Sequence, residues 1–323
     1  MSKPRISVNY EALKLIEDLR RDSDKYGVIF KKTHLNANLI DAGIKARGGF
    51  SAGRIITEIC MGGLGSAEIT YKNYGDISLP TITVTTDHPA ISTLGSQLAG
   101  WRIKTEKYSA IGSGPARALA LKPRSIYREI GYKDEAESAI LVLESSREPP
   151  EEVISDVSTK CKIEPENLFL ITVPTSSIAG LTQISGRIVE TGMHRLSKLG
   201  LDPNKILYAC GSAPIMPIHP DPVEAMGRAN DAILYGGATY YVVADIGDDE
   251  IRKIIGRAVS SASKQYGEPF KKIFEKAGFD FYKVDSNLFA PASITINNIE
   301  TGRVFKAGKI SPEILEKSLT AIQ

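Results

Sequence analysis

Apolar and polar positions follow helical spacing in some segments of the chain and strand-like spacing in others, and the two kinds are interleaved from end to end. The longest helical pattern spans 180–200, where Gly192 replaces an apolar residue and indicates that another element packs closely there. Ser185 has the residue type of an N-terminal cap, and Gly200 that of a C-terminal stop. The apolar stripe of this predicted helix is formed by Leu181, Ile184, Ile188, Leu196 and Leu199.

The remaining segments complete an alternation of helices and strands. Asn9 is the expected cap of the first helix and Gly27 its expected stop. This first helix is predicted at 10–26. Further helices are predicted at 36–47, 90–101, 115–121, 151–163, 222–236, 248–267, 269–278 and 312–322. Strands are predicted at 28–33, 53–61, 67–75, 79–87, 102–110, 138–145, 167–175, 206–213, 238–246 and 281–285, with a hairpin at 293–308. Hairpin signals together with helix crossovers predict an α/β protein built of layered domains on mixed α+β sheets.

A chain of 323 residues is long enough for two domains. Residues 145–152, SSREPPEE, are charged, contain two prolines and have no apolar period, as linkers do. The expected division is therefore a first α/β domain at 1–148 and a second at 149–323, with C-terminal segments able to pack back on the first.

Charge and composition narrow the class of partner. With 40 basic and 38 acidic residues the net charge is +2, which argues against a nucleic-acid binder but leaves room for a local basic pocket. No apolar run approaches the ~18 residues of a membrane helix, and the N-terminus lacks the core of a signal peptide, so no membrane association and a cytoplasmic location are expected. Cys60, Cys161 and Cys210 are few and far apart, as small buried thiols are.

The candidate chemistry lies on the helix predicted at 180–200. Arg187 and Glu190 are three residues apart, so a guanidinium and a carboxylate share one face of its first turns. Spacing alone favours a solvated intrahelical ion pair, whereas a pair facing a pocket could position and deprotonate a water molecule. His194 lies on the same side one turn later.

Other motifs are less specific. The glycine-rich stretch IGSGPARALAL at 111–121 could hold a phosphate, but it lacks the P-loop ending and is more typical of a strand-to-helix turn. The glycines of MGGLGSAE at 61–68 are typical of a bulge or a close backbone approach. The four histidines form no metal-binding pattern, and no metal site is predicted. Composition and spacing by themselves lead to a two-domain α/β protein and do not fix an activity.

Two stretches carry a resemblance to a known family. TLGSQLAGW at 93–101 and ISGRIVETGMHRL at 184–196 resemble methenyltetrahydromethanopterin cyclohydrolases, one-carbon enzymes of methanogenic and related archaea that also occur in methylotrophic bacteria. Further similar stretches follow in order along the chain: AEITYKNYG, AIGSGPARAL, YACGSAPI, GRANDAILYGG, NLFAPASITINN and TGRVFKAGKI.

The resemblance implies a homotrimer of two-domain subunits, each with a pocket between its domains for the pterin carrier. It implies the reversible conversion of the cationic 5,10-methenyl carrier and water into the 5-formyl carrier, without a cofactor, since tetrahydromethanopterin is the substrate. Arg187 and Glu190 match the family's catalytic pair. The segment matching a substrate-facing part of the first half is Gly95, Ser96, Gln97 and Leu98.

The chemistry of the carrier fits these residues. Its bridging carbon is already electrophilic, so a metal is not needed, and Glu190 is expected to move the proton while Arg187 holds water and carboxylate in place. Backbone N–H groups at 95–98 are expected to stabilise charge on oxygen, and His194 is expected beside the site or at the surface. Basic residues between Arg117 and Arg128 are candidates for the carrier's anionic tail.

Two alternatives stay open at this point. One is a non-catalytic protein that binds a pterin or a nucleotide through the glycine-rich turns. The other is a cyclohydrolase that acts on the folate carrier.

Overall fold

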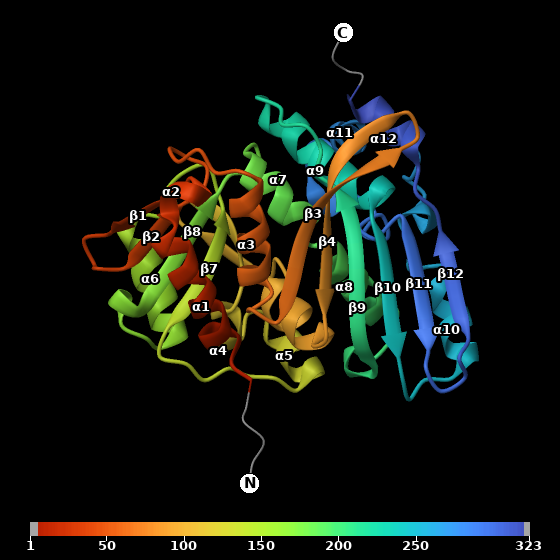
Figure 1. The fold of residues 1–323 in the computed structure, drawn as a ribbon, viewed down its shortest axis with the longest axis horizontal. Coiled ribbons are helices and arrows are strands. Elements are labelled where there is room, and N and C mark those ends of the chain that lie inside the picture. The colour runs from red at the N-terminus through yellow and green to blue at the C-terminus, as the bar shows by residue number, and fades with distance from the viewer. Residues whose placement is uncertain (1–5, 320–323) are drawn as a thin grey trace. The chain divides into compact units, whose positions relative to one another are not determined.

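The computed structural model describes residues 6–319, in which helices and strands alternate along the chain (Figure 1). The strands are β1 Ile29–Lys32, β2 Asn38–Asp41, β3 Gly65–Tyr74, β4 Ile77–Thr86, β5 Trp101–Lys104, β6 Ser109–Ser113, β7 Ala139–Glu144, β8 Leu168–Val173, β9 Ile206–Pro214, β10 Ala238–Val243, β11 Ser293–Asn298 and β12 Val304–Gly308. The α-helices are α1 Val8–Arg21, α2 Ser23–Tyr26, α3 Phe50–Cys60, α4 Ala116–Ala120, α5 Arg124–Ile130, α6 Glu151–Cys161, α7 Ile178–Ser185, α8 Ile188–Lys198, α9 Pro222–Gly236, α10 Asp248–Ile255, α11 Phe270–Lys276 and α12 Pro312–Leu319. A π-helix, η1, spans Ala90–Gln97, and short 3₁₀ turns are η2 Pro165–Asn167, η3 Pro203–Lys205, η4 Ser260–Ala262 and η5 Phe281–Lys283.

The chain forms two compact units, each discontinuous in sequence. Unit 1 comprises residues 1–66 and 90–183, and unit 2 comprises residues 67–89 and 184–323. The chain therefore changes unit three times, and none of these crossings lies at the division at 148 expected from SSREPPEE. That segment lies inside unit 1, where Pro150 immediately precedes α6, so its prolines mark a helix start.

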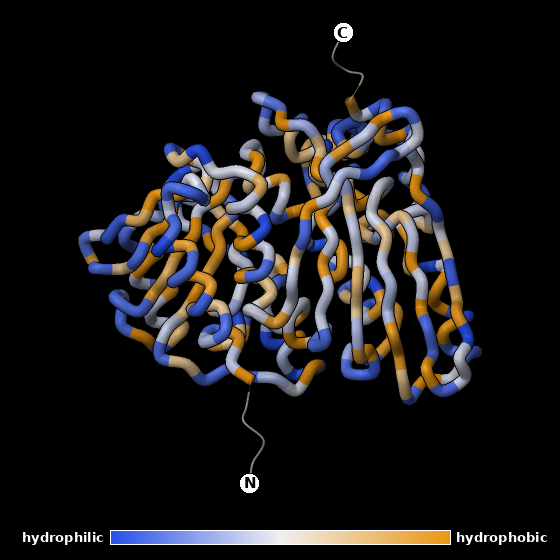
Figure 2. The backbone as a smooth tube through the Cα atoms, viewed as in Figure 1, coloured by the Kyte–Doolittle hydropathy of each residue, from blue (hydrophilic) through white to orange (hydrophobic). Residues whose placement is uncertain are grey.

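Unit 1 is a three-layer α/β/α arrangement around the sheet β1-β2-β8-β7-β6-β5. Strands β2, β8 and β7 run parallel at its centre, and antiparallel strands complete its edges. Figure 2 shows how apolar these central strands are. Ile16 of α1 and Ile56 of α3 pack on one face, and Val153 and Val157 of α6 pack on the other.

Unit 2 contains the mixed sheet β12-β11-β10-β9-β4-β3. Helices α9, α11 and α12 share an apolar cluster with residues of β3 and β4, centred on the fully buried Tyr235 and Phe270. Tyr208 of β9 and Tyr240 of β10 project from one face of the sheet and are exposed, whereas Tyr241 projects from the other face and is buried. Both units are thus mixed α/β layers, as the alternation of elements predicts.

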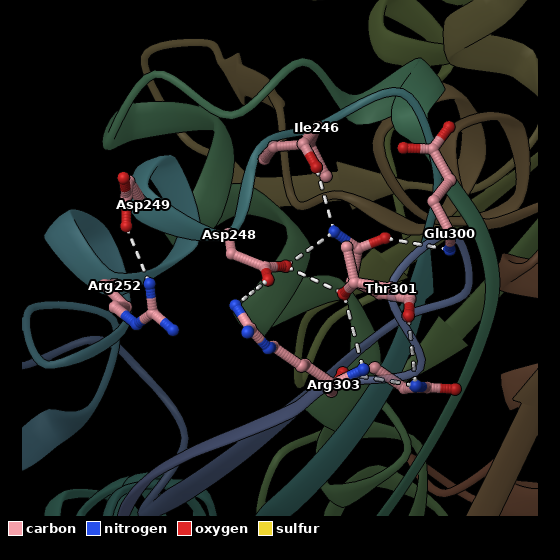
Figure 3. Close-up of polar contacts among 9 residues, drawn as sticks. Ile246, Asp248, Asp249, Arg252, Glu300, Thr301 and Arg303 are labelled. Carbon is pink, nitrogen blue, oxygen red and sulfur yellow. Dashed lines mark hydrogen bonds and ion pairs between the residues drawn. The ribbon is translucent and has the colours of Figure 1, made fainter.

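The hairpin predicted at 293–308 is present and is tied to α10 by one carboxylate. Asp248 accepts hydrogen bonds from Asn298 at 2.9 Å, Thr301 at 2.9 Å and Arg303 at 2.8 Å (Figure 3). Desolvation opposes its ionisation, but these hydrogen bonds prevail and lower the pKa of Asp248. The hairpin turn is therefore held against the first turn of α10.

Several predicted elements are wrong, for identifiable reasons. Residues 53–60 belong to α3 instead of a strand, because Ala52, Ile55 and Ile59 also satisfy helical spacing and face the core. Residues 36–47 contain β2 followed by a turn instead of a helix, because the Asp41 carboxylate accepts hydrogen bonds from four successive amides after it. The strand predicted at 281–285 is the turn η5, and the helix predicted at 248–267 ends at Ile255.

The start of the chain also differs in its details. Ser7, not Asn9, caps α1 by accepting a hydrogen bond from the Tyr10 amide at 3.1 Å. Asn9 lies inside α1, where its side chain donates to Asp134 and accepts from the Ile140 amide. The helix predicted at 10–26 is two helices, because α1 ends at Arg21, and the predicted stop Gly27 ends α2 at a φ of 64°.

The glycines at 61–68 have the predicted role of close backbone approach. A Cβ atom on Gly62 would lie 2.5 Å from Cβ of Val8 in α1. Cys60 and Cys161 are buried, as expected, and Cys210 is half-buried. No helix within the part of the chain that the structure describes is long and apolar enough to cross a membrane.

Candidate active site

The segment 180–200 is two helices instead of the predicted one. α7 ends at Ser185, and α8 begins at Ile188 after a break at Gly186 and Arg187. Ser185 does not cap the following helix, because its hydroxyl donates to the Pro214 carbonyl at the end of β9 at 2.8 Å. The break places Arg187 at the cap position of α8.

Arg187 and Glu190 form an ion pair at the start of α8. Nε of Arg187 lies 3.4 Å from a carboxylate oxygen of Glu190, and the two side chains are only 11% and 8% exposed. The solvated surface pair that spacing favours is therefore wrong. The carboxylate also lies in the first turn of the helix, where the partial positive charge of the helix N-terminus attracts a negative side chain.

A buried ion pair of this kind adds little to stability, because desolvating both groups offsets most of their attraction. It is, however, an arrangement in which a base and a cation are held in fixed positions with little competing water. The pair is therefore better suited to chemistry than to holding the fold together.

The first turn of α8 is anchored from β10. The Tyr241 hydroxyl donates to the Val189 carbonyl at 2.8 Å, directly before Glu190 in sequence. Tyr241 is fully buried, and burial raises the pKa of its hydroxyl, which remains a donor. A Cβ atom on Gly192 would lie 2.1 Å from this hydroxyl oxygen, so the predicted close packing at Gly192 is confirmed. The sequence signals the gap at Gly192 but not the residue that fills it.

The other polar residues of α8 lie in different surroundings. His194 is half-buried one turn beyond the ion pair. Arg195 is buried, and its guanidinium donates to the Arg257 carbonyl and, at 2.7 Å, to Asn287. Arg195 thus links the loop after α10 to the loop before β11.

The predicted substrate-binding residues Gly95, Ser96, Gln97 and Leu98 lie in unit 1, whereas Arg187 and Glu190 lie in unit 2. The first three end the π-helix η1, which occupies most of the helix predicted at 90–101. A π-helix is a rare conformation that is frequent at functional sites. The Leu98 amide donates to the Thr93 carbonyl at 2.8 Å, and the Ser96 hydroxyl donates to the Cys60 carbonyl at 2.6 Å. The Leu98 N–H group is therefore already hydrogen-bonded within this turn and does not point to a substrate oxygen.

Arg117 is not available as a ligand for an anionic tail. The stretch 111–121 is the predicted strand-to-helix turn, from β6 into α4, and Arg117 within it is 0% exposed. Of the basic residues up to Arg128, Lys122 is half-buried, and Arg124 and Arg128 are exposed. No group of three or more His, Cys, Asp or Glu side chains within residues 6–319 is arranged to hold a metal ion.

A carboxylate and a guanidinium that are buried together at a helix N-terminus of a mixed α/β protein form the kind of site that acid–base enzymes use. Comparison with known proteins identifies the family. The family described as Cyclohydrolase (MCH) matches residues 7–319. The chain belongs to the methenyltetrahydromethanopterin cyclohydrolase family.

Relatives that carry this name are similar over nearly their whole length. The chain is 45% identical to methenyltetrahydromethanopterin cyclohydrolase of Methanothermobacter marburgensis over 97% of this chain and 99% of the relative. It is 45% identical to that of Methanocaldococcus jannaschii, over 97% and 98%, and 44% identical to that of Methanococcoides burtonii, over 97% and 98%.

Proposed function

We propose that this chain catalyses the reversible hydrolysis of 5,10-methenyl-tetrahydromethanopterin to 5-formyl-tetrahydromethanopterin. The observation that carries the proposal is the buried Arg187–Glu190 pair at the start of α8. The family match over residues 7–319 supports the choice of substrate.

In the proposed mechanism Glu190 is the general base. It takes one proton from a water molecule as the water oxygen bonds to the amidinium carbon, which neutralises the substrate cation. The protonated carboxyl then gives this proton to the departing nitrogen as the C–N bond breaks. The remaining hydroxyl proton leaves to solvent as the formyl C=O bond forms, so one proton is released overall.

Arg187 has a positioning role in this mechanism. Its guanidinium is planar and presents several donors, and at 3.4 Å it holds the Glu190 carboxylate in one orientation. The segment 95–98 of unit 1 is proposed to face the reacting carbon, and no cofactor is required. This assignment of 95–98 rests on the resemblance to the family.

The proposal is tested by the loss of absorbance when the conjugated methenyl carrier is hydrolysed. We expect Glu190→Gln to lower turnover by about 10²–10⁴-fold, because the amide cannot accept the proton. The matched control is Asp249→Asn, which breaks the i,i+3 pair of Asp249 and Arg252 in the first turn of α10 (Figure 3). Asp249 is 85% exposed, so this variant should keep wild-type turnover.

The same assay separates the alternatives. A non-catalytic pterin- or nucleotide-binding protein would bind the methenyl carrier without any change in its absorbance. A cyclohydrolase of the folate class would hydrolyse methenyltetrahydrofolate faster than the methanopterin carrier. Near wild-type turnover by Glu190→Gln would contradict the role given to this carboxylate.

The homotrimer that the resemblance implies is part of the proposal. The exposed Tyr208 and Tyr240 on β9 and β10 are candidates for such contacts, since their strands are paired and both face the uncovered side of the sheet. Light scattering should then give three times the chain mass of 35.0 kDa, and Tyr240→Glu should lower this value. A single-chain mass for the wild type would contradict the trimer.

A further inference from the structure

The last carbonyl groups of the π-helix η1 have partners outside the helix. Because η1 ends at Gln97, the carbonyls of Leu94, Gly95 and Ser96 have no following helical N–H group to accept from. Buried carbonyls without a partner are costly, so the fold has to supply donors to this helix end. Three groups from other parts of unit 1 do so.

Arg117 and Tyr127 supply donors to all three carbonyls. Nη1 of Arg117 donates to Leu94 at 3.2 Å and to Ser96 at 2.9 Å, and the Tyr127 hydroxyl donates to Gly95 at 2.8 Å. The Gly114 amide adds a further bond to Ser96 at 2.9 Å.

The Arg117 guanidinium is itself fixed from several sides. Its Nε donates to the Lys122 carbonyl at 2.8 Å, and the Tyr127 ring centroid lies 5.7 Å from its central carbon. A Cβ atom at Gly100 would lie 2.8 Å from Nη2, so this position needs glycine to leave room for the guanidinium. The cation thus has one position, at the carbonyl end of η1, where it also offsets the helix dipole.

Burying an arginine costs free energy of folding, because its charged group loses its hydration. Replacing buried charged groups by apolar side chains of similar size often leaves stability unchanged or raises it. What Arg117 provides that an apolar residue cannot is a set of directed donors. Those donors fix the direction of the peptide groups of residues 94–96, and thereby of the segment 95–98.

We propose that Arg117 and Tyr127 are positioning residues for the cyclohydrolase reaction, holding the segment 95–98 in the geometry that the substrate requires. This inference rests on the proposed function, in which that segment faces the reacting carbon. Neither residue touches the substrate in this proposal; both act through the carbonyl groups that they hold. Small displacements of positioned groups have large effects on rate.

The test compares two tyrosines of unit 1. Tyr127→Phe removes the bond to Gly95, whereas the control Tyr132→Phe removes bonds to the Ile6 carbonyl at 3.0 Å and from the Val8 amide at 3.3 Å, at the start of α1. We expect similar decreases in Tm for the two variants, but only Tyr127→Phe should lower kcat for the methenyl carrier, by about tenfold, with less change in KM. If both variants keep kcat within twofold of wild type, the inference is overturned.

Arg117 is tested with a conservative and a non-conservative variant. Arg117→Met keeps the length without the donors, and Arg117→Lys restores one charged donor group. We expect Arg117→Met to lose about 10²-fold in kcat and Arg117→Lys to recover part of this loss. Equal kcat losses in the two variants would contradict positioning through directed donors. If neither variant folds, the comparison of the two tyrosines decides.

Hydrogen exchange separates this inference from the proposed function. We expect amides of residues 90–98 to exchange faster in Tyr127→Phe than in Tyr132→Phe, whether or not the wild type turns over the methenyl carrier. A wild type without turnover would overturn the proposed function and the role of the two residues in that reaction, but not their hold on the segment 95–98. Unchanged exchange at 90–98 in Tyr127→Phe would overturn the inference alone.

Discussion

The hydroxyl of Tyr241 lies where the side chain of residue 192 would begin. A Cβ atom on Gly192 would be 2.1 Å from the Tyr241 oxygen and 3.0 Å from the ring carbon that carries it. The same hydroxyl donates to the Val189 carbonyl. Strand β10 and the first turn of α8 are therefore locked together beside Glu190.

Gly192→Ala should move these elements apart. Overpacking of this kind typically costs about 1–3 kcal/mol in the free energy of unfolding, and the shift of α8 should also lower kcat, because Glu190 is in the adjacent turn. Urea unfolding and the absorbance assay measure the two effects. Gly256→Ala is the control, since no atom lies within 4 Å of a Cβ at that position and φ is −64°. A Gly192→Ala variant as stable as this control would contradict the contact.

Tyr241→Phe should cost about 0.5–1.5 kcal/mol of unfolding free energy, because it removes the buried hydrogen bond from the hydroxyl to the Val189 carbonyl. In a double-mutant cycle with Gly192→Ala the two effects should be less than additive, since removing the hydroxyl relieves the closest clash. Additive values from urea unfolding would show that the two residues do not interact.

Arg187→Lys should lower kcat by at least about tenfold, because an ammonium point charge cannot reproduce the planar donor set beside the Glu190 carboxylate. The matched variant is Arg252→Lys, whose partner Asp249 is exposed. Steady-state turnover of the methenyl carrier provides the comparison. Equal kcat for the two variants would remove the positioning role of Arg187.

Asp231 should make stability depend on pH. Burial raises its pKa to about 7, against the opposing effect of hydrogen bonds from the Ser318 hydroxyl at 2.6 Å and the Phe270 amide at 2.8 Å. Glu224 on the same helix raises this pKa further, and Arg228 lowers it. Between pH ~4 and pH 7 the folded chain keeps a proton that the unfolded chain loses, so stability should fall as pH rises, by about 1.4 kcal/mol per pH unit at most.

Asp231→Asn should remove this slope, because asparagine keeps an acceptor and a donor at this position without a charge to desolvate. Urea unfolding at several pH values between 4 and 7 measures the effect. A wild type whose stability does not fall over this range, relative to Asp231→Asn, would contradict the shift.

The sequence predicts β7 and β8 of unit 1 because their apolar runs match one structure only, but it assigns β2 of the same sheet to a helix. β7 and β8 lie within the predicted ranges, whereas α3 is missed because its isoleucines fit both helical and strand spacing. The turn after β2 is missed because it depends on the hydrogen bonds of one carboxylate, that of Asp41.

The candidate site shows a similar limit. The spacing of Arg187 and Glu190 identifies them as a pair. It does not show that their side chains are buried, because that depends on the elements that pack around α8. Gly192 signals a close neighbour, and only the fold shows that it is Tyr241. Arg117 is predicted as a candidate ligand for the carrier's anionic tail, because nothing in the sequence connects it to the three carbonyl groups that it binds in the fold.

The hairpin of β3 and β4 emerges early in synthesis, yet it belongs to unit 2. Its partner is β9, where Ala209 pairs with Thr86. Most of unit 1 is therefore synthesised after β4 and before β9. Until β9 has been synthesised, the edge of β4 that pairs with it has no partner strand. Truncation after residue 148 would leave this hairpin without its sheet, so the N-terminal half is not an independent folding unit.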